Sequence, residues 1–424
     1  MTGTSSQEPG QSSGIFYGWF VVGACFMITL TLGETFWSFG VFFKSLEDEF
    51  GWSRTVVSSG YTAFLLGHAL SLVVSGRLAD RYNPRPILLC TAVVASAGIA
   101  LCGSIQDVTQ FRVFLFVAGL GAGPIWAIPN ATVQRWFYGR KRAGLALAIT
   151  TTGVGVGALI FAPLINQFIM SFGWRSAFHY VGISFFVILL LSALLVRKPP
   201  TLPETIEKPL PAVYSLNLGR VITRPSFLGI TMVVTISIVS FQAMSVHLTP
   251  FARDAGISAG SAAAALGLIG GFSIPGRLLS GVISQNIGWQ KTLTLALLGT
   301  AGAVTWLVFT GSTWMLYVFV FFYGLGHGIR IPAQMGILNE FFGMKSLGQL
   351  IGLTTAVGQL IGSLAPYMAG FVFDRTGSYT AFFALIISLL LAAAIVAFRL
   401  KEDPDIVEGT ALMGDAGSAG NQVR

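Results

Sequence analysis

Charged side chains are scarce in this sequence. They make up 10% of the 424 residues, whereas hydrophobic residues make up 54%. A soluble domain carries about 25% charged residues, so water cannot be the main solvent of this protein's surface. The shortage of charge excludes a soluble enzyme, a nucleic-acid-binding domain and a disordered scaffold, so we expect no nucleic-acid partner. The composition is instead typical of a protein that crosses the lipid bilayer several times.

The sequence also has few residues suited to redox or metal chemistry. Its three cysteines, Cys25, Cys90 and Cys102, lie in apolar runs and lack the spacing of metal ligands or of a disulfide framework. The sequence contains neither a Walker-type loop nor a nucleophile elbow. We therefore expect no metal and no cofactor, and we predict that the protein is not an enzyme.

Long apolar runs are what the sequence does contain. A membrane-spanning helix needs about 20 predominantly apolar residues. Cutting the sequence at charge clusters and turn residues leaves twelve runs of about this length, at residues 16–43, 55–78, 85–106, 110–134, 143–169, 174–197, 227–252, 261–287, 290–311, 313–340, 346–373 and 378–400. We predict an all-α membrane protein with twelve transmembrane helices.

Basic residues are distributed unevenly between the two sides of these runs. With a cytoplasmic N-terminus, most Lys and Arg residues fall in cytoplasmic loops, among them Arg135, Arg140, Lys141 and Arg142. This bias is the one that the positive-inside rule describes. It predicts cytoplasmic termini for a protein of the plasma membrane or the bacterial inner membrane.

The sequence contains an internal repeat. One constant offset aligns Gly51 with Gly256 and Gly119 with Gly324. Two six-helix copies related in this way are the organisation of transporters that rock around a site at the middle of the membrane.

A proline-rich connection separates the two copies. It spans 198–226 and is the only long polar segment before the C-terminal tail. We therefore expect one six-helix half at 16–197 and another at 227–400, with cytoplasmic tails at 1–15 and 401–424.

The turn between the second and third runs carries a family motif. It reads Gly76-Arg77-Leu78-Ala79-Asp80-Arg81-Tyr82-Asn83-Pro84-Arg85. This segment resembles the signature loop of the major facilitator superfamily, with Asn83 in place of the usual glycine. The resemblance implies a fold of two pseudo-symmetric six-helix halves. It also makes Gly76, Asp80, Arg81 and Arg85 candidates for a charge clamp that closes one gate.

Within that superfamily the chain is most similar to the branch of monocarboxylate transporters and oxalate/formate antiporters. The similarity rests on three local segments, at 37–42, 50–54 and 136–146, and on the run Pro275-Gly276-Arg277-Leu278-Leu279-Ser280-Gly281. That run aligns with the span that carries the carboxylate-binding arginine of the branch. The resemblance therefore implies that Arg277 binds a substrate carboxylate.

Charged residues and histidines near the middle of the apolar runs are few. They are Glu34, His68, His247, Arg277, His327 and Arg330. A charge at the middle of a span costs at least about 2.5–3.5 kcal/mol, so each needs a reason. Arg277 is the strongest substrate-binding candidate because a guanidinium offers a planar fork that fits a carboxylate. The alternative for Arg277 is a structural ion pair with Glu34.

The remaining interior groups have open roles. His247 is a candidate for substrate binding and for proton coupling, because histidine titrates near neutral pH. Many relatives carry an acid at the position of Ser273, so the coupling proton would here move to His247 or Glu34. For Glu34 the alternative is a static salt bridge with Arg330, which is itself a second candidate for binding an anion.

Polar and aromatic neighbours complete the predicted site. We expect Asn130, Trp126 and Tyr61 to line the substrate cavity and to contact the organic part of the substrate.

Together these features predict a secondary active transporter of small organic anions. The expected substrates are monocarboxylates of the lactate or pyruvate kind, carried by alternating access in a monomer, with the proton as coupling ion. A dicarboxylate or formate exchanger is the first alternative, because Arg330 adds a second interior cation. A drug exporter is less favoured because it would carry unpaired acids. The tail 401–424 resembles no signalling domain, which disfavours a membrane sensor that does not transport.

Overall fold

The computed structural model describes residues 16–138, 140, 142–197, 221–342 and 347–401. Nearly all of these residues are helical. The helices are α1 Gly18–Phe50, α2 Arg54–Arg81, α3 Pro84–Leu101, the short 3-10 helix η1 Cys102–Ser104, α4 Val108–Ala122, α5 Pro124–Trp136, α6 Ala143–Leu195, α9 Pro225–Asp254, α10 Ala259–Ile287, α11 Trp289–Val308, α12 Thr313–Phe342, α13 Leu347–Gly362, α14 Ala365–Thr376 and α15 Thr380–Arg399.

Ten stretches of described helix are long and apolar enough to cross a membrane. One of them, α6, has 53 residues, which at 1.5 Å per residue gives about 80 Å, more than twice the hydrocarbon core of a bilayer. The backbone of Gly173 leaves the helical region, with φ 79° and ψ 159°, so α6 consists of two arms. Dividing α6 there and adding the 28-residue α2 accounts for the twelve predicted spans.

The helix ends follow from local side-chain chemistry. The side chain of Ser53 accepts a hydrogen bond from Val56 N at the start of α2, and Asp107 caps the start of α4 in the same way. Such caps satisfy backbone N–H groups that have no partner within the helix. Gly51 and Gly377 end α1 and α14 in the left-handed conformation that glycine adopts without strain.

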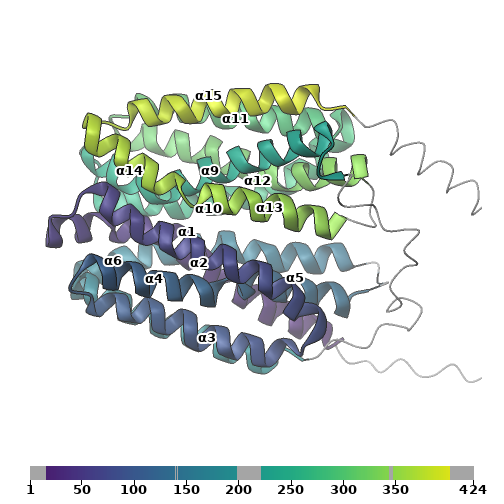
Figure 1. Ribbon diagram of the computed structural model, residues 1–424, viewed down its shortest axis with the longest axis horizontal. Helices are drawn as coiled ribbons and strands as arrows, with labels where there is room; N and C mark the ends of the chain where they lie inside the picture. Colours follow the sequence, from purple (N-terminus) through teal and green to yellow (C-terminus); the bar gives the residue numbers. More distant parts are fainter. Residues whose placement is uncertain (1–15, 139, 141, 198–220, 343–346, 402–424) are drawn as a thin grey trace, which may run out of the picture.

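The helices form two bundles that lie side by side, α1–α6 and α9–α15 (Figure 1). The start of α1 and the ends of α5 and α6 meet at one end of the assembly, which we name the terminal side. Phe16 packs against Trp136 there with ring centroids 6.0 Å apart, and Trp136 Nε1 donates to Arg197 O at 3.3 Å. The other end, which carries Gly51, is named the far side.

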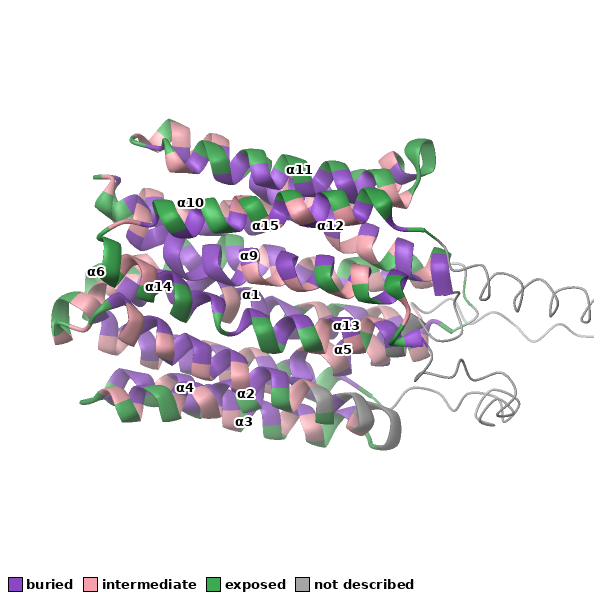
Figure 2. Cartoon of the chain, turned by 45° about the horizontal axis from the view of Figure 1, so that its top comes forward, coloured by how far each residue is buried: buried purple, intermediate pink, exposed green. Residues whose placement is uncertain are grey.

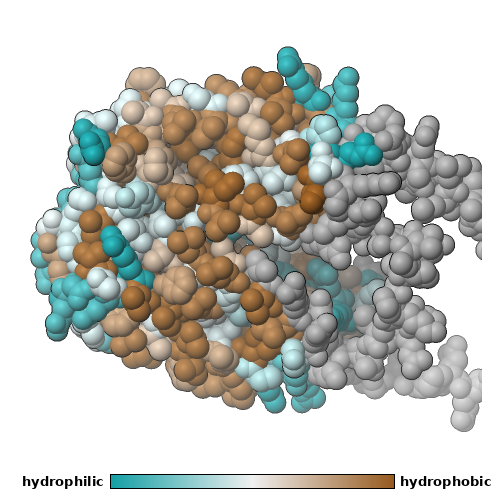
Figure 3. Space-filling model, in the orientation of Figure 1, coloured by the Kyte–Doolittle hydropathy of each residue, from teal (hydrophilic) through white to brown (hydrophobic). Residues whose placement is uncertain are grey.

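The outside of the bundle is apolar in a broad zone between its two ends. Buried positions face the helix–helix contacts, and exposed positions lie on outer faces and at helix ends (Figure 2). Many exposed residues are large and hydrophobic, including Leu159, Ile183 and Phe322. In the space-filling view they form a hydrophobic zone between more polar ends (Figure 3). This surface fits a multi-pass membrane protein.

Glycines allow α1 and the first arm of α6 to touch backbone to backbone. A Cβ atom on Gly157 would overlap Leu30 O, and one on Gly33 would overlap Val154 O. Because lipid gives no hydrophobic force between helices, such close approach through small residues holds a bundle together.

We expect Gly157→Leu to destabilise the protein by roughly 1–3 kcal/mol or more, because the new side chain must push α1 away from α6. The measurement is thermal unfolding of the purified protein in detergent. Gly299→Leu is the matched control, since a Cβ on Gly299 of α11 meets nothing within 4 Å. An equal loss of stability in both variants would contradict the close-packing role.

Candidate functional site

A cavity lies between the two halves, with a volume of about 1240 Å³ that includes space open to solvent. It extends from Trp37 and Gln242 toward Leu338 and Ile351, which lie nearer the terminal side. The surface is hollowed between the halves near that end (Figure 3). Both halves contribute, because α1, α2, α5 and α6 line it on one side and α9, α10, α12 and α13 on the other.

Arg277 of α10 lies on the wall of this cavity. Its Nη1 donates a hydrogen bond of 2.8 Å to Thr151 O of α6, in the other half. Its Nε is buried and has no partner among the described residues. The Nε–Nη2 edge of a guanidinium is the one that binds a carboxylate with two hydrogen bonds, so the unpartnered Nε marks Arg277 as a candidate anion-binding group.

Arg330 of α12 lines the same cavity and is 3% exposed. Its Nη1 donates to Ser237 O at 2.9 Å, and its Nη2 lies 2.9 Å from His327 Nδ1. Arginine has no acceptor, so His327 Nδ1 accepts this hydrogen bond. The Nε of Arg330 has no partner in the described part of the chain.

Neither cavity arginine pairs with a carboxylate among the residues that the structure describes. Glu34 lies outside this cavity, where its Oε1 lies 2.9 Å from Ser184 Oγ. The ion pairs considered between Glu34 and Arg277 or Arg330 are therefore not formed. The cavity wall carries an excess of positive charge.

Aromatic rings shape the middle of the cavity. Phe241 stacks on His327 with ring centroids 4.9 Å apart, and Trp37 packs edge-on against Phe241 at 4.8 Å. Phe36 packs edge-on against His68 at 5.1 Å. All five side chains line the cavity.

Of the predicted neighbours of the site, the structure brings only Trp126 to the cavity wall. Tyr61 donates to Phe36 O at 3.1 Å and lines a separate pocket inside the first half. Asn130 lies one turn after Trp126 and donates to Trp126 O at 2.7 Å. Neither residue is among the described residues that line the cavity.

His247, a substrate-binding candidate, also lies away from the cavity. Its Nε2 is 2.8 Å from Pro366 O, and its Nδ1 is 2.8 Å from the hydroxyl of Tyr379. A carbonyl only accepts, so Nε2 carries the hydrogen and Nδ1 accepts from Tyr379. The ring is 1% exposed and joins α9 to α14 and to Tyr379 at the start of α15.

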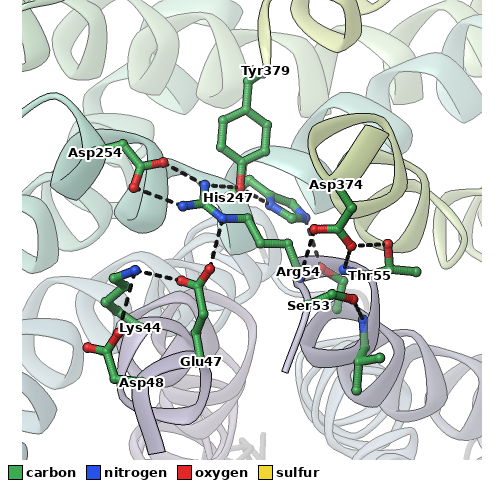
Figure 4. A network of polar contacts seen from close by, with 12 residues as sticks. Lys44, Glu47, Asp48, Ser53, Arg54, Thr55, His247, Asp254, Asp374 and Tyr379 are labelled. Carbon is green, nitrogen blue, oxygen red and sulfur yellow. Dashed lines mark hydrogen bonds and ion pairs between the residues drawn. The ribbon is translucent and has the colours of Figure 1, made fainter. Parts of the chain in front are cut away.

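Around His247 the two halves are held together on the far side (Figure 4). Arg54, the first residue of α2, donates to Asp254 at the end of α9 from both terminal nitrogens, at 2.6 and 2.8 Å. Its Nη1 also donates to the Tyr379 hydroxyl at 2.9 Å, and its guanidinium lies over the ring of Phe373 at 3.7 Å. We name this group, with Glu47, His247 and Asp374, the far-side latch.

Asp374 forms the second part of the far-side latch. Its carboxylate accepts hydrogen bonds from the backbone N–H groups of Arg54 at 3.0 Å and Thr55 at 2.8 Å. A carboxylate at a helix N-terminus satisfies unpaired N–H groups and interacts favourably with the helix dipole. Here the cap of α2 comes from α14, in the other half of the protein.

Comparison with known proteins settles the family. The model of the Major Facilitator Superfamily matches residues 19–313 and 290–415, which together cover most of the chain. The chain belongs to the Major Facilitator Superfamily. The predictions of this family, of its helical membrane fold and of a protein that is not an enzyme are thereby confirmed.

Relatives within the superfamily are transporters at low identity. The human Monocarboxylate transporter 11 is 28% identical over 93% of this chain and 85% of its own length. The Oxalate:formate antiporter of Oxalobacter formigenes is 24% identical over 93% of this chain and 94% of its own.

Solved structures show the same fold. The D-xylose-proton symporter superposes with a TM-score of 0.72 at 15% identity, covering 91% of this chain and 98% of that one. A bacterial homologue of the human lysosomal transporter Spinster, in an inward-facing conformation, gives a TM-score of 0.69 at 17% identity, covering 92% and 95%.

The superfamily loop lies on the terminal side. The side chains of Gly76, Asp80 and Arg81 fall outside the described residues, so their predicted clamp is not tested. Arg85 is described: its Nε donates to Ala193 O at 3.2 Å, and its Nη2 bonds Leu194 O. Arg85 therefore ties α3 to the end of α6 within one half.

Sequence reasoning missed the far-side latch, although a signal was present. Arg54 begins a helix, Asp254 ends one, and Asp374 lies in the last turn of another. Each charge sits at the helix end where the dipole disfavours it. Three such misplacements on one side of a membrane protein indicate that these residues pair with one another.

We expect Arg54→Gln to open the far side, because Asp254 loses its bidentate partner. The measurement is maleimide labelling of Ser58→Cys, which lies beside His247 at the seam, in a chain that also carries Cys90→Ser; Cys25 and Cys102 are buried. Labelling should accelerate about tenfold, equivalent to about 1.4 kcal/mol.

Arg112→Gln is the control for this labelling experiment. Arg112 donates to Ser59 at 2.8 Å within one half, so its loss should leave the labelling rate of Ser58→Cys unchanged. An equal rate in the Arg54 and Arg112 variants would contradict the latch.

Proposed function

We propose that this superfamily member is a secondary active transporter of small organic anions. Its preferred substrates are monocarboxylates of the size of lactate or pyruvate, and it carries them by alternating access. The observation that carries this proposal is Arg277, which lines the cavity and has no carboxylate partner among the described residues, while its Nε makes no hydrogen bond there.

The charge balance of the cavity supports an anionic substrate. Two arginines line it, and in the described part of the chain neither is neutralised by an acid. A guanidinium stays charged at any physiological pH, and a buried charge without a partner is costly. A bound carboxylate lowers this cost by supplying the missing countercharge.

The rest of the cavity supports a small organic substrate. Trp37, Phe241 and Trp126 offer apolar surface, while Gln242 and Gln334 offer a few polar contacts. Pockets of this kind, apolar with a small number of placed polar groups, are typical of sites for small organic molecules.

The far-side latch and the cavity support alternating access. The halves touch on the far side through Arg54, Asp254 and Asp374, whereas the cavity extends toward the terminal side. If both termini are cytoplasmic, as the basic residues favour, this conformation faces the cytoplasm. Transport then requires the far-side latch to open while the terminal side closes.

We further propose the proton as the coupling ion and the plasma or inner membrane of the cell as the location, with the monomer as the functional unit. A proton that accompanies each monocarboxylate cancels its charge, so accumulation follows a pH gradient. The relatives named for monocarboxylate transport and for oxalate–formate exchange support the substrate class.

A second candidate is transport of dicarboxylates by exchange. Arg330 favours it, because this arginine lines the same cavity and its Nε has no partner among the described residues. Two cations on one wall would suit a substrate with two carboxylates. Both Nη atoms of Arg330 are already engaged, however, so Arg330 offers less of its fork than Arg277 does.

We expect Arg277→Lys to lower uptake of labelled lactate or pyruvate into proteoliposomes by at least about tenfold, or about 1.4 kcal/mol, because a point charge replaces a planar fork. Arg253→Lys, an exposed arginine at the end of α9, is the control and should transport like the parent protein. Unchanged uptake in Arg277→Lys would remove this residue from the site.

Thermal shift separates the two substrate classes. A ligand that binds only the folded state raises the unfolding temperature by mass action. We expect short monocarboxylates to stabilise both the parent protein and Arg330→Gln. Stabilisation by dicarboxylates alone, lost in Arg330→Gln, would instead favour the exchanger.

A further inference from the structure

Glu34 is a buried acid that the cavity does not use. It lies on α1 and is 1% exposed. Two and three residues further along the same helix, Phe36 and Trp37 line the cavity. Glu34 faces away from them, toward a small pocket inside the first half and a larger, more open one between the two arms of α6.

The two pockets around Glu34 are largely apolar. The first pocket is lined from α1, α2, α3, α4 and α6 by largely apolar side chains, and the second by α1 and the two arms of α6. The titratable side chains that face the two pockets are Tyr61 of α2 and Tyr180 of α6. No Lys, Arg or His is among the described residues that line either pocket.

The hydrogen bonds of Glu34 fit a protonated carboxyl group. Ser184 Oγ lies 2.9 Å from Glu34 Oε1 and 2.9 Å from Val181 O. A hydroxyl has one hydrogen and cannot donate to both. When Ser184 donates to Val181, which can only accept, the contact with Glu34 requires a hydrogen on the carboxyl group.

Two further polar atoms in this region lack partners. Glu34 Oε2 and Ser38 Oγ are buried, and neither has a hydrogen-bond partner in the described part of the chain. Ser38 follows Glu34 by one helical turn and lines the same pocket. An ionised carboxylate here would have one oxygen without any compensation, which costs several kcal/mol in an apolar interior.

We propose that Glu34 is the site that binds the coupling proton, and that this site is separate from the substrate cavity. The carboxylate takes up one proton to become a neutral carboxyl group and releases the same proton later in the cycle. No covalent bond other than O–H forms or breaks. This inference rests on the proposed function for its transport step.

The position of Glu34 on α1 explains how the proton and the substrate are coupled. The conformation described here suits the neutral acid, because Glu34 is 1% exposed and the described residues that line its two pockets supply no cation. Loss of the proton disfavours this packing and favours an arrangement in which Glu34 is hydrated. Since α1 also lines the cavity, the two sites bias the same helix, which is the condition for linkage between two ligands.

The transport test compares Glu34→Gln with the parent protein in proteoliposomes. Glutamine mimics the neutral acid, so exchange of labelled monocarboxylate across the membrane without a gradient should stay within about threefold. Accumulation driven by an imposed inward pH gradient should be lost. Glu49→Gln, on the same helix but exposed beside Arg175, is the matched control and should retain both activities.

A second measurement does not depend on transport. Infrared difference spectroscopy of the purified protein across a pH titration should show the band of a protonated carboxyl group in the parent protein and in Glu49→Gln. The band should be missing in Glu34→Gln. If the protein transports no carboxylate substrate but the band is present in the parent protein and missing in Glu34→Gln, the proposed function fails and the proton site stands.

Three results would overturn the proposal. One is gradient-driven accumulation by Glu34→Gln at the parent level. Another is the loss of both exchange and accumulation in Glu34→Gln, when thermal unfolding shows that this variant is still folded. Glu34 would then be needed for substrate binding or for the structure. The third is accumulation that follows a sodium gradient and ignores the pH gradient.

Discussion

The conformation of this transporter depends on one side chain, the guanidinium of Arg54. It joins the halves by reaching Asp254 and Tyr379, while the backbone of the same residue is capped by Asp374. Because these contacts close one end of the interface, the space between the halves is left at the other end. The cavity with Arg277 and Arg330 therefore lies in the part of the interface that the far-side contacts leave open.

The described residues that line the cavity include two arginines and no carboxylate, so this part of the interior is positively charged. Arginine cannot neutralise itself by losing a proton, unlike a buried acid or histidine. Among the described residues Glu34 is the one buried acid, and no Lys, Arg or His of the described chain lines its pockets. The acid and the two arginines thus lie in different bundles, Glu34 in α1 and the arginines in α10 and α12.

The sequence was sufficient to predict the fold, but it did not show which face of each helix points toward the cavity. Apolar runs, the repeat and the loop at 76–85 predicted the family and the twelve spans, and the position of Arg277 agreed with its family motif. Depth in the membrane can be read from the distance to the ends of a run. The direction in which a side chain points cannot be read from the sequence in this way, because helices that are packed on all sides show little amphipathic pattern. This is why Tyr61 and His247, at plausible depths, lie elsewhere than on the cavity wall.

The hydrogen bond from Arg277 to Thr151 has a mechanical consequence. It connects α10 of one bundle to α6 of the other at the edge of the binding surface, so a bound anion would lie on the seam rather than within one bundle. Any relative rotation of the bundles changes the distance from the Arg277 guanidinium to Thr151, and at the same time it changes the shape of the proposed anion-binding surface. If an anion binds Arg277 as proposed, its release would accompany the relative movement of the two bundles.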